Sequence, residues 1–570
     1  MPNMTSTTGR RAQLSAVAAL LGCALLAGCQ SRTNVSATGN TAAQFTHVFL
    51  TINQIWFNTS ASAAAADTTW VKFPLATPQT IDLVTLNNGT LSQFASELKL
   101  TAGTYAQVMV ILADSTDALS TSAQSAGAVT NDEVDYLDTS DVAHTVPLAV
   151  LNAAQGISIG TSLTVATSSS VGSTSSTAST SSTATSSASS LSGVVATTSA
   201  IVDFDATRDL VPISLSGQPA FVLNPHPHSY NVANAGTIQG AVSLTGVSTL
   251  TDAGSPDVQV SAEALSSDGT RHVIVKTTRV GTDGTFILYP LSTASGAPST
   301  YDLVIHGPDI QTVIVKAVPV TNAAPGSTAA LLGTLTLTPA TPYLVNLNTS
   351  SPAAPTSSLV GFYQTLPLSS EVPYLVEVRA VDPTSGVFAS AQELSGSSLQ
   401  YGTYTSGTVS LTTVNPSQGA ATYTVGAINP AYGTATLGTT VTAPANLATT
   451  ALFTMNAPPL PSGTTANAIQ GTISVATSTY DNAELFLTYN GALVAAAPLT
   501  AYLGSSQGTL ALNAIAPGGS GAATYASGVY YGEVWAWNST NPTGTLTRIP
   551  YASPIDMSAG NATGVTLSIN

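Results

Sequence analysis

The segment Val48-Phe-Leu-Thr-Ile-Asn-Gln-Ile-Trp-Phe57 consists mainly of β-branched and aromatic residues, and apolar and polar side chains alternate along part of it. Both features are typical of a β-strand that is buried on one face. Segments of the same kind follow at short intervals, over Thr69–Phe73, Gln79–Val84 and Ala106–Leu112. Together with the repeats described below, they predict a mostly β protein.

One segment in this region has a different spacing. After the turn signal Asn88-Gly89, apolar residues occur at intervals of three and four. They are Leu91, Phe94, Ala95 and Leu98. Because this interval places side chains on one face of a helix, we expect a short amphipathic helix over residues 91–98.

The composition restricts the class of protein. The chain has 570 residues, of which 44% are hydrophobic and only 7% are charged, so it can bury several cores. The chain contains 12 Lys and Arg residues and 28 Asp and Glu residues, which gives a net charge of −16. Nucleic-acid binding requires basic patches, so no nucleic-acid partner is expected. The only cysteines, Cys23 and Cys29, are too few and too close to the amino terminus for a disulfide-stapled fold.

The amino terminus has the pattern of an export signal. Arg10 and Arg11 precede an apolar run that ends in Leu26-Ala27-Gly28-Cys29, which resembles the lipobox of bacterial lipoproteins. Small residues fit the cleft of the signal peptidase, and the cysteine thiol accepts the lipid group. We therefore expect residues 1–28 to be a lipoprotein signal peptide and Cys29 to carry the lipid anchor. The alternative is an ordinary secretory signal with a chance cysteine.

The residues after the lipobox suggest the final location. Gln30, rather than aspartate, follows the cysteine, and in the sorting pattern of Gram-negative lipoproteins this favours the bacterial outer membrane, on its periplasmic or surface face. Residues 29–41 are predicted to be a polar tether. No later segment is long and apolar enough for a transmembrane helix, so the anchor is the expected membrane contact.

Two longer segments carry a family resemblance. They read TIDLVTLNNGTLSQFASELKLTAGTYAQVMVIL at residues 80–112 and IVDFDATRDLV at residues 201–211. Residues 42–230, which contain both, resemble the bacterial lipoprotein family catalogued as domain of unknown function 4382. That family has no established catalytic residues, so the resemblance implies no active site.

A low-complexity segment interrupts this domain. Residues 166–200 are almost entirely Ser, Thr and Ala and contain no charge. Such a segment cannot bury enough apolar surface to offset its ordering entropy. We predict a disordered loop between two strands, of which the second is Ile201–Phe204, acting as a spacer.

Internal similarity organises the rest of the chain. Ile238-Gln-Gly-Ala-Val-Ser243 recurs as Ile469-Gln-Gly-Thr-Ile-Ser474, with a weaker copy at Leu359–Gln364. Each copy is followed by a second β-rich segment. The spacing suits β-sandwiches of about 100 residues, so we predict three transthyretin-like or immunoglobulin-like sandwich units over residues 236–340, 357–455 and 467–570.

The first unit also carries a resemblance of its own. Pro256–Val260, Thr282–Phe286 and Tyr301–Ile305, together with Ile238-Gln-Gly240, resemble the carboxypeptidase regulatory-like, or transthyretin-like, sandwich. The other two units match only in outline. Such modules usually act as spacers or binding platforms, so the resemblance implies a scaffold.

Two groups of residues are the metal candidates. His226 and His228 flank Pro227, and a third ligand would have to come from His47, His144 or a carboxylate, because two imidazoles are too few for a zinc site. The densest acidic run contributes Asp132, Asp135 and Asp138. It fails the EF-hand pattern and is interpreted as a solvated loop, with a loose calcium site as the alternative. We predict no bound metal or cofactor.

Two further patterns resemble functional sites. Trp535 and Trp537 would share one face of a strand, and we expect them to take core positions, with an aromatic platform for a glycan as the alternative. Gly504-Ser-Ser-Gln-Gly508 matches the Gly-x-Ser-x-Gly expression of hydrolases, but a β-rich segment follows it and no histidine occurs after His306. We therefore expect no catalytic residue there.

The sequence thus favours a non-enzymatic, lipid-anchored envelope protein that presents sandwich modules as spacers or as binders of a glycan or protein ligand. One alternative is an envelope hydrolase that uses a carboxylate pair or a metal. Another is an accessory subunit of an envelope complex.

Overall fold

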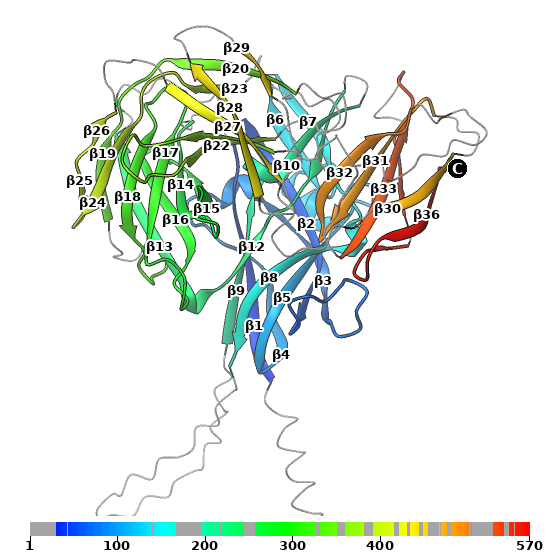
Figure 1. The fold of residues 1–570 in the computed structure, drawn as a ribbon. Helices are drawn as coiled ribbons and strands as arrows, with labels where there is room; N and C mark the ends of the chain where they lie inside the picture. Colours follow the sequence, from blue (N-terminus) through cyan, green and yellow to red (C-terminus); the bar gives the residue numbers. More distant parts are fainter. Residues whose placement is uncertain are drawn as a thin grey trace, which may run out of the picture.

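The computed structural model of the chain describes residues 30–42, 44–138, 142–166, 197–215, 218–243, 245, 257–326, 331–349, 359–380, 392–414, 421–429, 434–443, 449–453, 467, 469–475, 480–500, 503, 528–540, 546–551 and 553–569. The protein is mostly β, as predicted (Figure 1). The helical segments described are short: α2 (Thr121–Ala126), α3 (Ala206–Asp209) and the single turns η1 (Leu83–Leu86), η2 (Ala153–Gln155) and η3 (Val232–Asn234). The lipobox, Leu26 to Cys29, lies outside the described residues.

The first domain consists of two sheets. The smaller has the order β12-β9-β1-β4, formed by His228–Asn231, Thr197–Asp205, Gln30–Asn40 and Ser92–Thr101. The larger has the order β10-β11-β7-β6-β2-β5-β8, with β3 paired to β2. Its strands are β10 (Leu210–Leu215), β11 (Gln218–Leu223), β7 (Ala143–Val150), β6 (Glu133–Leu137), β2 (Phe45–Asn58), β5 (Gly103–Leu112), β8 (Ile157–Val165) and β3 (Val71–Asp82).

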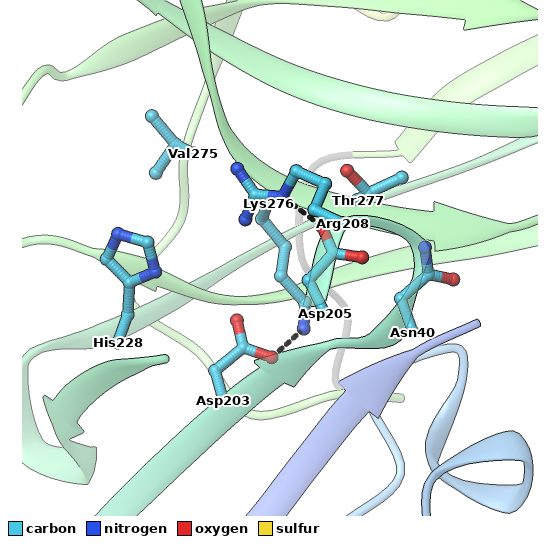
Figure 2. A pocket seen from close by; sticks show the side chains of 8 residues that line it. All are labelled: Asn40, Asp203, Asp205, Arg208, His228, Val275, Lys276 and Thr277. Atoms are coloured by element: carbon cyan, nitrogen blue, oxygen red, sulfur yellow. Dashed lines mark hydrogen bonds and ion pairs between the residues drawn. The ribbon is translucent and has the colours of Figure 1, made fainter. Parts of the chain in front are cut away.

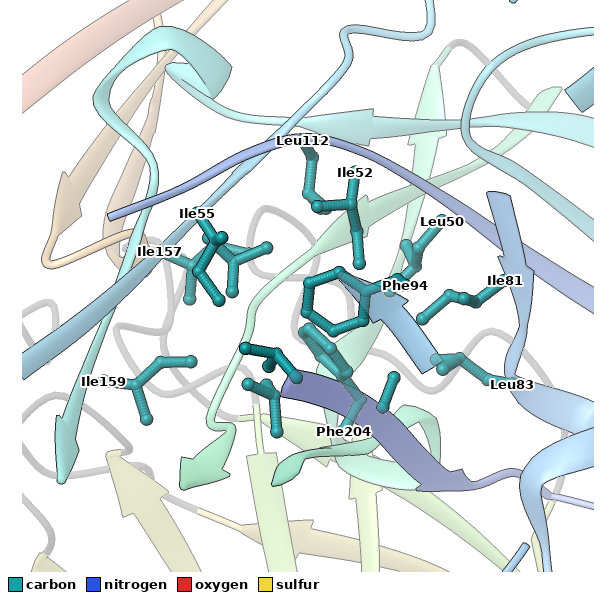
Figure 3. Close-up of a cluster of buried hydrophobic side chains, with 14 of the residues drawn as sticks. Leu50, Ile52, Ile55, Ile81, Leu83, Phe94, Leu112, Ile157, Ile159 and Phe204 are labelled. Carbon is teal, nitrogen blue, oxygen red and sulfur yellow. The ribbon is translucent and has the colours of Figure 1, made fainter. Parts of the chain in front are cut away.

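The main core of this domain is one large apolar cluster. The predicted strand at Val48–Phe57 lies within β2, and Leu50, Ile52 and Ile55 are fully buried in that cluster. Figure 3 shows these side chains together with Phe94 of β4 and Phe204 of β9. The cluster therefore joins strands from both sheets.

Residues 30–40 form a strand of the fold, so the prediction of a tether over residues 29–41 is wrong for this segment. β1 pairs in parallel with β9 and antiparallel with β4. Ser31, Thr33, Val35 and Ala37 are all fully buried, which is the two-residue period of a strand. The polar composition hid this role, because a strand between two neighbours satisfies its backbone groups through them.

The predicted helix over residues 91–98 is also wrong, because these residues belong mainly to β4. Register shifts occur where β1 and β4 pair, between Thr33 and Val35 and between Val35 and Ser36. Phe94 and Ala95 are consecutive and both buried, and Glu97 has a positive φ of 54°. The irregular pairing of this strand imitated a helical spacing in the sequence.

The low-complexity segment does separate two strands, β8 and β9, as predicted. Its predicted end is too late, however, because Thr197–Ala200 already belong to β9 and pair with residues of β1. Residues 167–196 lie outside the described residues.

The described residues after Asn234 form three sandwich units whose strands pair in similar orders. In the first, β13 (Ala235–Ser243) pairs with β16 (Thr285–Ser292) and in parallel with β19 (Leu331–Thr336), and the facing sheet is β15-β14-β17-β18. Those strands are His272–Arg279, Gln259–Leu265, Thr300–His306 and Val313–Pro319. In the third unit, β30 (Ile469–Val475) likewise pairs in parallel with the last strand, β36 (Ala562–Ile569). Its facing sheet is β32-β31-β33-β34 with β35, formed by Ala492–Pro498, Asn482–Tyr489, Val529–Trp537, Thr547–Pro550 and Ile555–Asp556.

The second unit begins one strand earlier than the sequence similarity suggested. β20 (Pro342–Thr349) pairs in parallel with β29 (Thr449–Phe453) and antiparallel with β23 (Gln392–Ser395), so β20 takes the place that β13 has in the first unit. The segment Leu359–Gln364 is β21, which pairs with β22 (Tyr374–Ala380) and β27 (Ala421–Asn429), and β27 pairs with β28 (Thr434–Ala443). It therefore corresponds to β14, not to the repeated Ile-Gln-Gly strand.

The first two units also share a sheet. β24 (Gln400–Thr405) belongs to the second unit by sequence but pairs in parallel with β18 of the first unit. The short strands β25 (Thr408–Val409) and β26 (Thr412–Thr413) pair with β24. This extension covers an edge of the first unit, so the two units are not structurally independent.

The corrected boundary of β9 leads to a comparison of two deletions. Replacing residues 167–196 with a short Gly/Ser bridge is expected to leave the melting temperature within about 3 °C, because loop-closure entropy depends only weakly on loop length. Extending the deletion through Ser199 removes the residues that pair with Arg32, Thr33 and Asn34, and the melting temperature is expected to fall by about 5 °C or more. Differential scanning calorimetry measures both. Equal melting temperatures for the two deletions would contradict the assignment of Thr197–Ser199 to the folded strand.

Candidate functional site

Trp535 and Trp537, for which a ligand platform was the alternative to a core position, lie in the interface between the first domain and the third unit. We call such an interface between two domains a seam. Trp535 and Trp537 are 1% and 5% exposed. They share an apolar cluster with residues in or directly after β7 and with residues of β10, β11, β31 and β32, namely Ala149, Leu151, Val211, Ile213, Val222, Phe486 and Leu493. The two tryptophans therefore take core positions, and the alternative of an aromatic platform is wrong, because the face that the two rings share is buried against another domain.

A buried charge network crosses the same seam. Arg548 donates from Nε to Glu533 (2.6 Å), from one terminal nitrogen to Asp114 (2.7 Å) and from the other to the backbone carbonyl of Val150 (2.7 Å). Glu533 also accepts from the indole nitrogen of Trp535 at 2.8 Å and from the backbone N–H of Asn152 at 2.7 Å. Side chains of both domains thus satisfy one another's charges.

A second seam joins the first domain to the first sandwich unit. It is built from Asp203-Phe-Asp-Ala-Thr-Arg208, which is part of the motif that carries the family resemblance. Phe204 points into the core of the first domain, so the alternation of β9 turns Asp203 and Asp205 to the opposite face. The ammonium of Lys276, on β15, donates to Asp203, and Arg208 lies 2.8 Å from Asp205 (Figure 2).

A pocket lies at this second seam. Besides the four charged residues it is lined by Asn40, His228, Val275 and Thr277. Asn40 is 1% exposed, and neither polar atom of its side chain has a hydrogen-bond partner. The space is too narrow to enclose a water molecule, and its two cations face two carboxylates. Burial raises the pKa of Asp203, which Lys276 only partly offsets. These properties describe an interdomain ion-pair network rather than a substrate cavity.

The two histidines proposed as metal ligands do not form a pair. His226 Nδ1 lies 3.0 Å from Asp209, the last residue of α3, and burial raises the pKa of that carboxyl group. His228 begins β12, opposite Asp203, and lines the pocket. Two other histidines also lie beside carboxylates. The ring of His47 contacts the carboxylate of Asp82, and the ring of His144 contacts the carboxylate of Asp138. In the part of the chain that the structure describes, no three His, Cys, Asp or Glu side chains form a metal-binding group.

The acidic run is not a solvated loop. Asp132 and Glu133 are 0% and 1% exposed, and Glu133–Leu137 form β6. One oxygen of Asp132 accepts the backbone N–H of Thr51 at 2.7 Å, while the other has no partner. Burial therefore raises the pKa of Asp132 well above its usual value. Asp135 lies on β6 and Asp138 accompanies His144, so the three candidate carboxylates do not converge.

A third seam joins the first two sandwich units, and no sequence pattern indicated it. His306 of β17 lies 3.1 Å from Glu377 of β22, which also meets Arg379 at 2.8 Å. Burial alone would raise the pKa of Glu377, but Arg379 and His306 outweigh it and lower that pKa. Nearby, Lys316 pairs with Glu371, and the Tyr374 hydroxyl donates to Asp302 at 2.8 Å.

The three seams share one design. In a chain with few charges, cations of the described units meet carboxylates of a neighbouring unit: Lys276 with Asp203, Arg548 with Asp114, and Lys316 with Glu371. Burying such groups is tolerable only when they are paired. Chemically, these clusters position the domains relative to one another.

Two remaining predictions concern the hydrolase-like Gly-x-Ser-x-Gly segment and transmembrane helices. The Gly504–Gly508 segment is not among the described residues. Within the described ranges, no helix has the length and apolarity needed to cross a bilayer.

The comparison with protein families supports one of the two resemblances. Residues 30–225 match the model of the family described as Domain of unknown function (DUF4382). The match covers the two-sheet domain up to the end of β11 and includes the Asp203–Arg208 motif. A search among curated proteins found no match.

Removing the Arg548 cation tests the seam of the third unit. Arg548→Met leaves Glu533, itself 1% exposed, without its cation, and a broken buried pair typically costs about 3–5 kcal/mol. Urea unfolding of the mature chain measures the loss. Arg32→Met is the matched control, because its ion pair with Glu97 is half exposed or more and should be worth about 0–1 kcal/mol. Equal effects of the two variants would contradict the buried network.

Asp132→Asn tests the buried carboxyl group through pH. Because the pKa is raised in the folded state, the ionised group destabilises the fold increasingly as pH rises above the unfolded value near 4. Each pH unit by which the folded pKa exceeds the unfolded pKa corresponds to about 1.4 kcal/mol. The variant is therefore expected to be more stable than the parent at pH 8, with the gain disappearing near pH 4. Urea midpoints at both pH values provide the measurement. A variant that is less stable at pH 8 would show that the ionised carboxylate is needed.

Proposed function

We propose that this chain is a lipid-anchored protein of the bacterial outer membrane that holds three β-sandwich modules at fixed positions around its first domain. Its role is to present these modules as spacers or as binders of a glycan or protein ligand. The protein is not proposed to be a catalyst.

The observation that carries the proposal is the construction of the seams. The side chains of Trp535, Arg548, Lys276 and Asp203 are all buried between domains. A protein that places several of its few charges and two of its four tryptophans between modules uses them to fix the arrangement of those modules. This fits a scaffold better than an enzyme, which needs perturbed groups that face a substrate cavity.

The family match supports the lipid anchor, because it begins at residue 30, directly after the lipobox cysteine. Gln30 at the position after the cysteine supports sorting to the outer membrane.

The topology of the three units supports the kind of module. In the second unit a three-stranded sheet faces a four-stranded sheet, and in the first unit a three-stranded sheet faces four of its own strands, which β24 of the second unit extends. In all three units the first and last strands pair in parallel. Together with the Asp283-Gly284 turn before β16, this supports a carboxypeptidase regulatory-like, or transthyretin-like, sandwich for the first unit. The accessory-subunit alternative has the same support, since fixed modules also suit a role inside a larger envelope complex.

Cys29→Ala tests the anchor. Without the thiol no lipid can be attached, so the variant is expected to leave the membrane fraction or to stay unprocessed. Fractionation after a carbonate wash, with mass spectrometry of the amino-terminal peptide, measures both outcomes. Cys23→Ala is the matched control, because that cysteine lies in the part of the signal that is removed. A processed Cys29→Ala protein that still pellets with membranes would contradict the proposal.

A further inference from the structure

We propose that the end of the first domain at which β1 begins rests directly on the lipid headgroups, with the rest of the protein extending away from the membrane. This inference builds on the lipid anchor proposed above. It adds which surface of the folded protein meets the bilayer and which chemistry that surface recognises.

The first observation is that the residues directly after the proposed anchor, Gln30 to Arg32, already belong to β1. Gln30 is already paired with Thr101, and Arg32 with Thr197. Ser31 is fully buried, and its hydroxyl donates to the carbonyl of Ala166. Consecutive Cα atoms are about 3.8 Å apart, so a lipidated Cys29 lies within a few ångströms of these residues. A tether, which would let the domain tumble, is absent from residues 30–40.

The second step is the composition of this end, which we call the β1 tip. Small and hydroxylated residues dominate it, and both described ends of the Ser/Thr-rich segment also lie there. In Figure 1 it is the lower end of the molecule, below the sandwich units. The residues of the tip are Gln30, Ser31, Thr101, Ala102, Gly103, Thr104, Val165, Ala166 and Thr197.

The third step is a pair of exposed cations beside the β1 tip. Arg32 and Lys99 are directly opposite each other on β1 and β4, and like charges in this relation destabilise a strand pair. Glu97 meets Arg32 at 2.6 Å, whereas Lys99 has no ion-pair partner in the described parts of the chain. Most other described cations are committed to carboxylates, several of them across the seams. In a protein of net charge −16, two cations at this position point to the anionic phosphate groups of a membrane surface.

The opposite end of the domain provides the internal reference. β1 runs for 11 residues, or roughly 35 Å at about 3.3 Å per residue, before the chain turns into β2. β6 pairs there with the start of β2, Tyr136 opposite Phe45. Val142, in the connection from β6 to β7, is 51% exposed. It should therefore stay well away from the headgroups.

The experiment uses the full-length lipidated protein in vesicles. Thr104→Cys at the β1 tip and Val142→Cys at the far end each introduce a single free thiol, because Cys29 is acylated in the mature protein. Each variant is labelled with a fluorophore and mixed with vesicles that carry a nitroxide on the lipid headgroup, a quencher that acts only at short range. Quenching is expected to be several-fold stronger at residue 104 than at residue 142.

A second set of vesicles tests the role of Arg32 and Lys99. Adding phosphatidylglycerol to phosphatidylcholine vesicles is expected to increase quenching at residue 104, and the Arg32→Gln/Lys99→Gln variant is expected to lose this increase. Lys72→Gln is the matched control, because the Lys72 ammonium lies 3.7 Å from the centre of the Trp56 ring on another strand pair, and it should retain the increase.

The possible failures are distinguishable. Protein that pellets with the vesicles but is quenched equally at both positions, or more strongly at residue 142, would overturn the proposed orientation and leave the anchor intact. Protein that stays in the supernatant would overturn the anchor itself, and the membrane-facing tip with it. Phosphatidylglycerol dependence that survives in the double variant would overturn the role of Arg32 and Lys99.

Discussion

The guanidinium of Arg548 donates to Glu533 of its own unit and to Asp114 and Val150 of the first domain, and this kind of contact is the constraint on which the arrangement of the protein depends. Only 7% of the residues are charged, so a buried cation that misses its carboxylate has few other partners. The apolar cluster around Trp535 and Trp537 supplies much of the attraction between the two domains. The ion pairs contribute less net stability, since both charges lose their hydration. Their effect is to penalise every other relative placement.

Strand pairing through the backbone also constrains the arrangement of the sandwich units. In the first unit the parallel pairing of β13 with β19 joins the start of the unit to its end, and the corresponding strands pair in the other two units. Exposed sheet edges invite unwanted pairing, and the edge at β18 is covered by β24 from the following unit. Backbone hydrogen bonds and side-chain ion pairs therefore couple the same two units.

The sequence predicted many of the strands and missed particular features for identifiable reasons. The apolar pattern of β2 was sufficient, because its alternation reflects a locally amphipathic strand. β1 was missed since its inward-facing residues include Ser31 and Thr33, which are buried only because β4 and β9 flank them. β4 was predicted as a helix because its irregular register with β1 buries Phe94 and Ala95 together. β20 was missed because the similarity of Leu359–Gln364 to the repeat motif was a similarity of composition, not of position in the sheet.

By itself the sequence determined the β character of the chain, the lipobox pattern at Cys29, the place of the Ser/Thr-rich segment and the existence of three repeated units. These are local properties: a two-residue period, a four-residue motif and a biased composition can each be read along the chain. Only the tertiary structure decided that Trp535 and Trp537 face another domain, that Asp203 meets Lys276 and that Asp132 is buried. The partners in these contacts lie from about seventy to several hundred residues apart. Burial and pairing over such distances depend on which sheets pack together, and no local pattern in a single sequence records that choice.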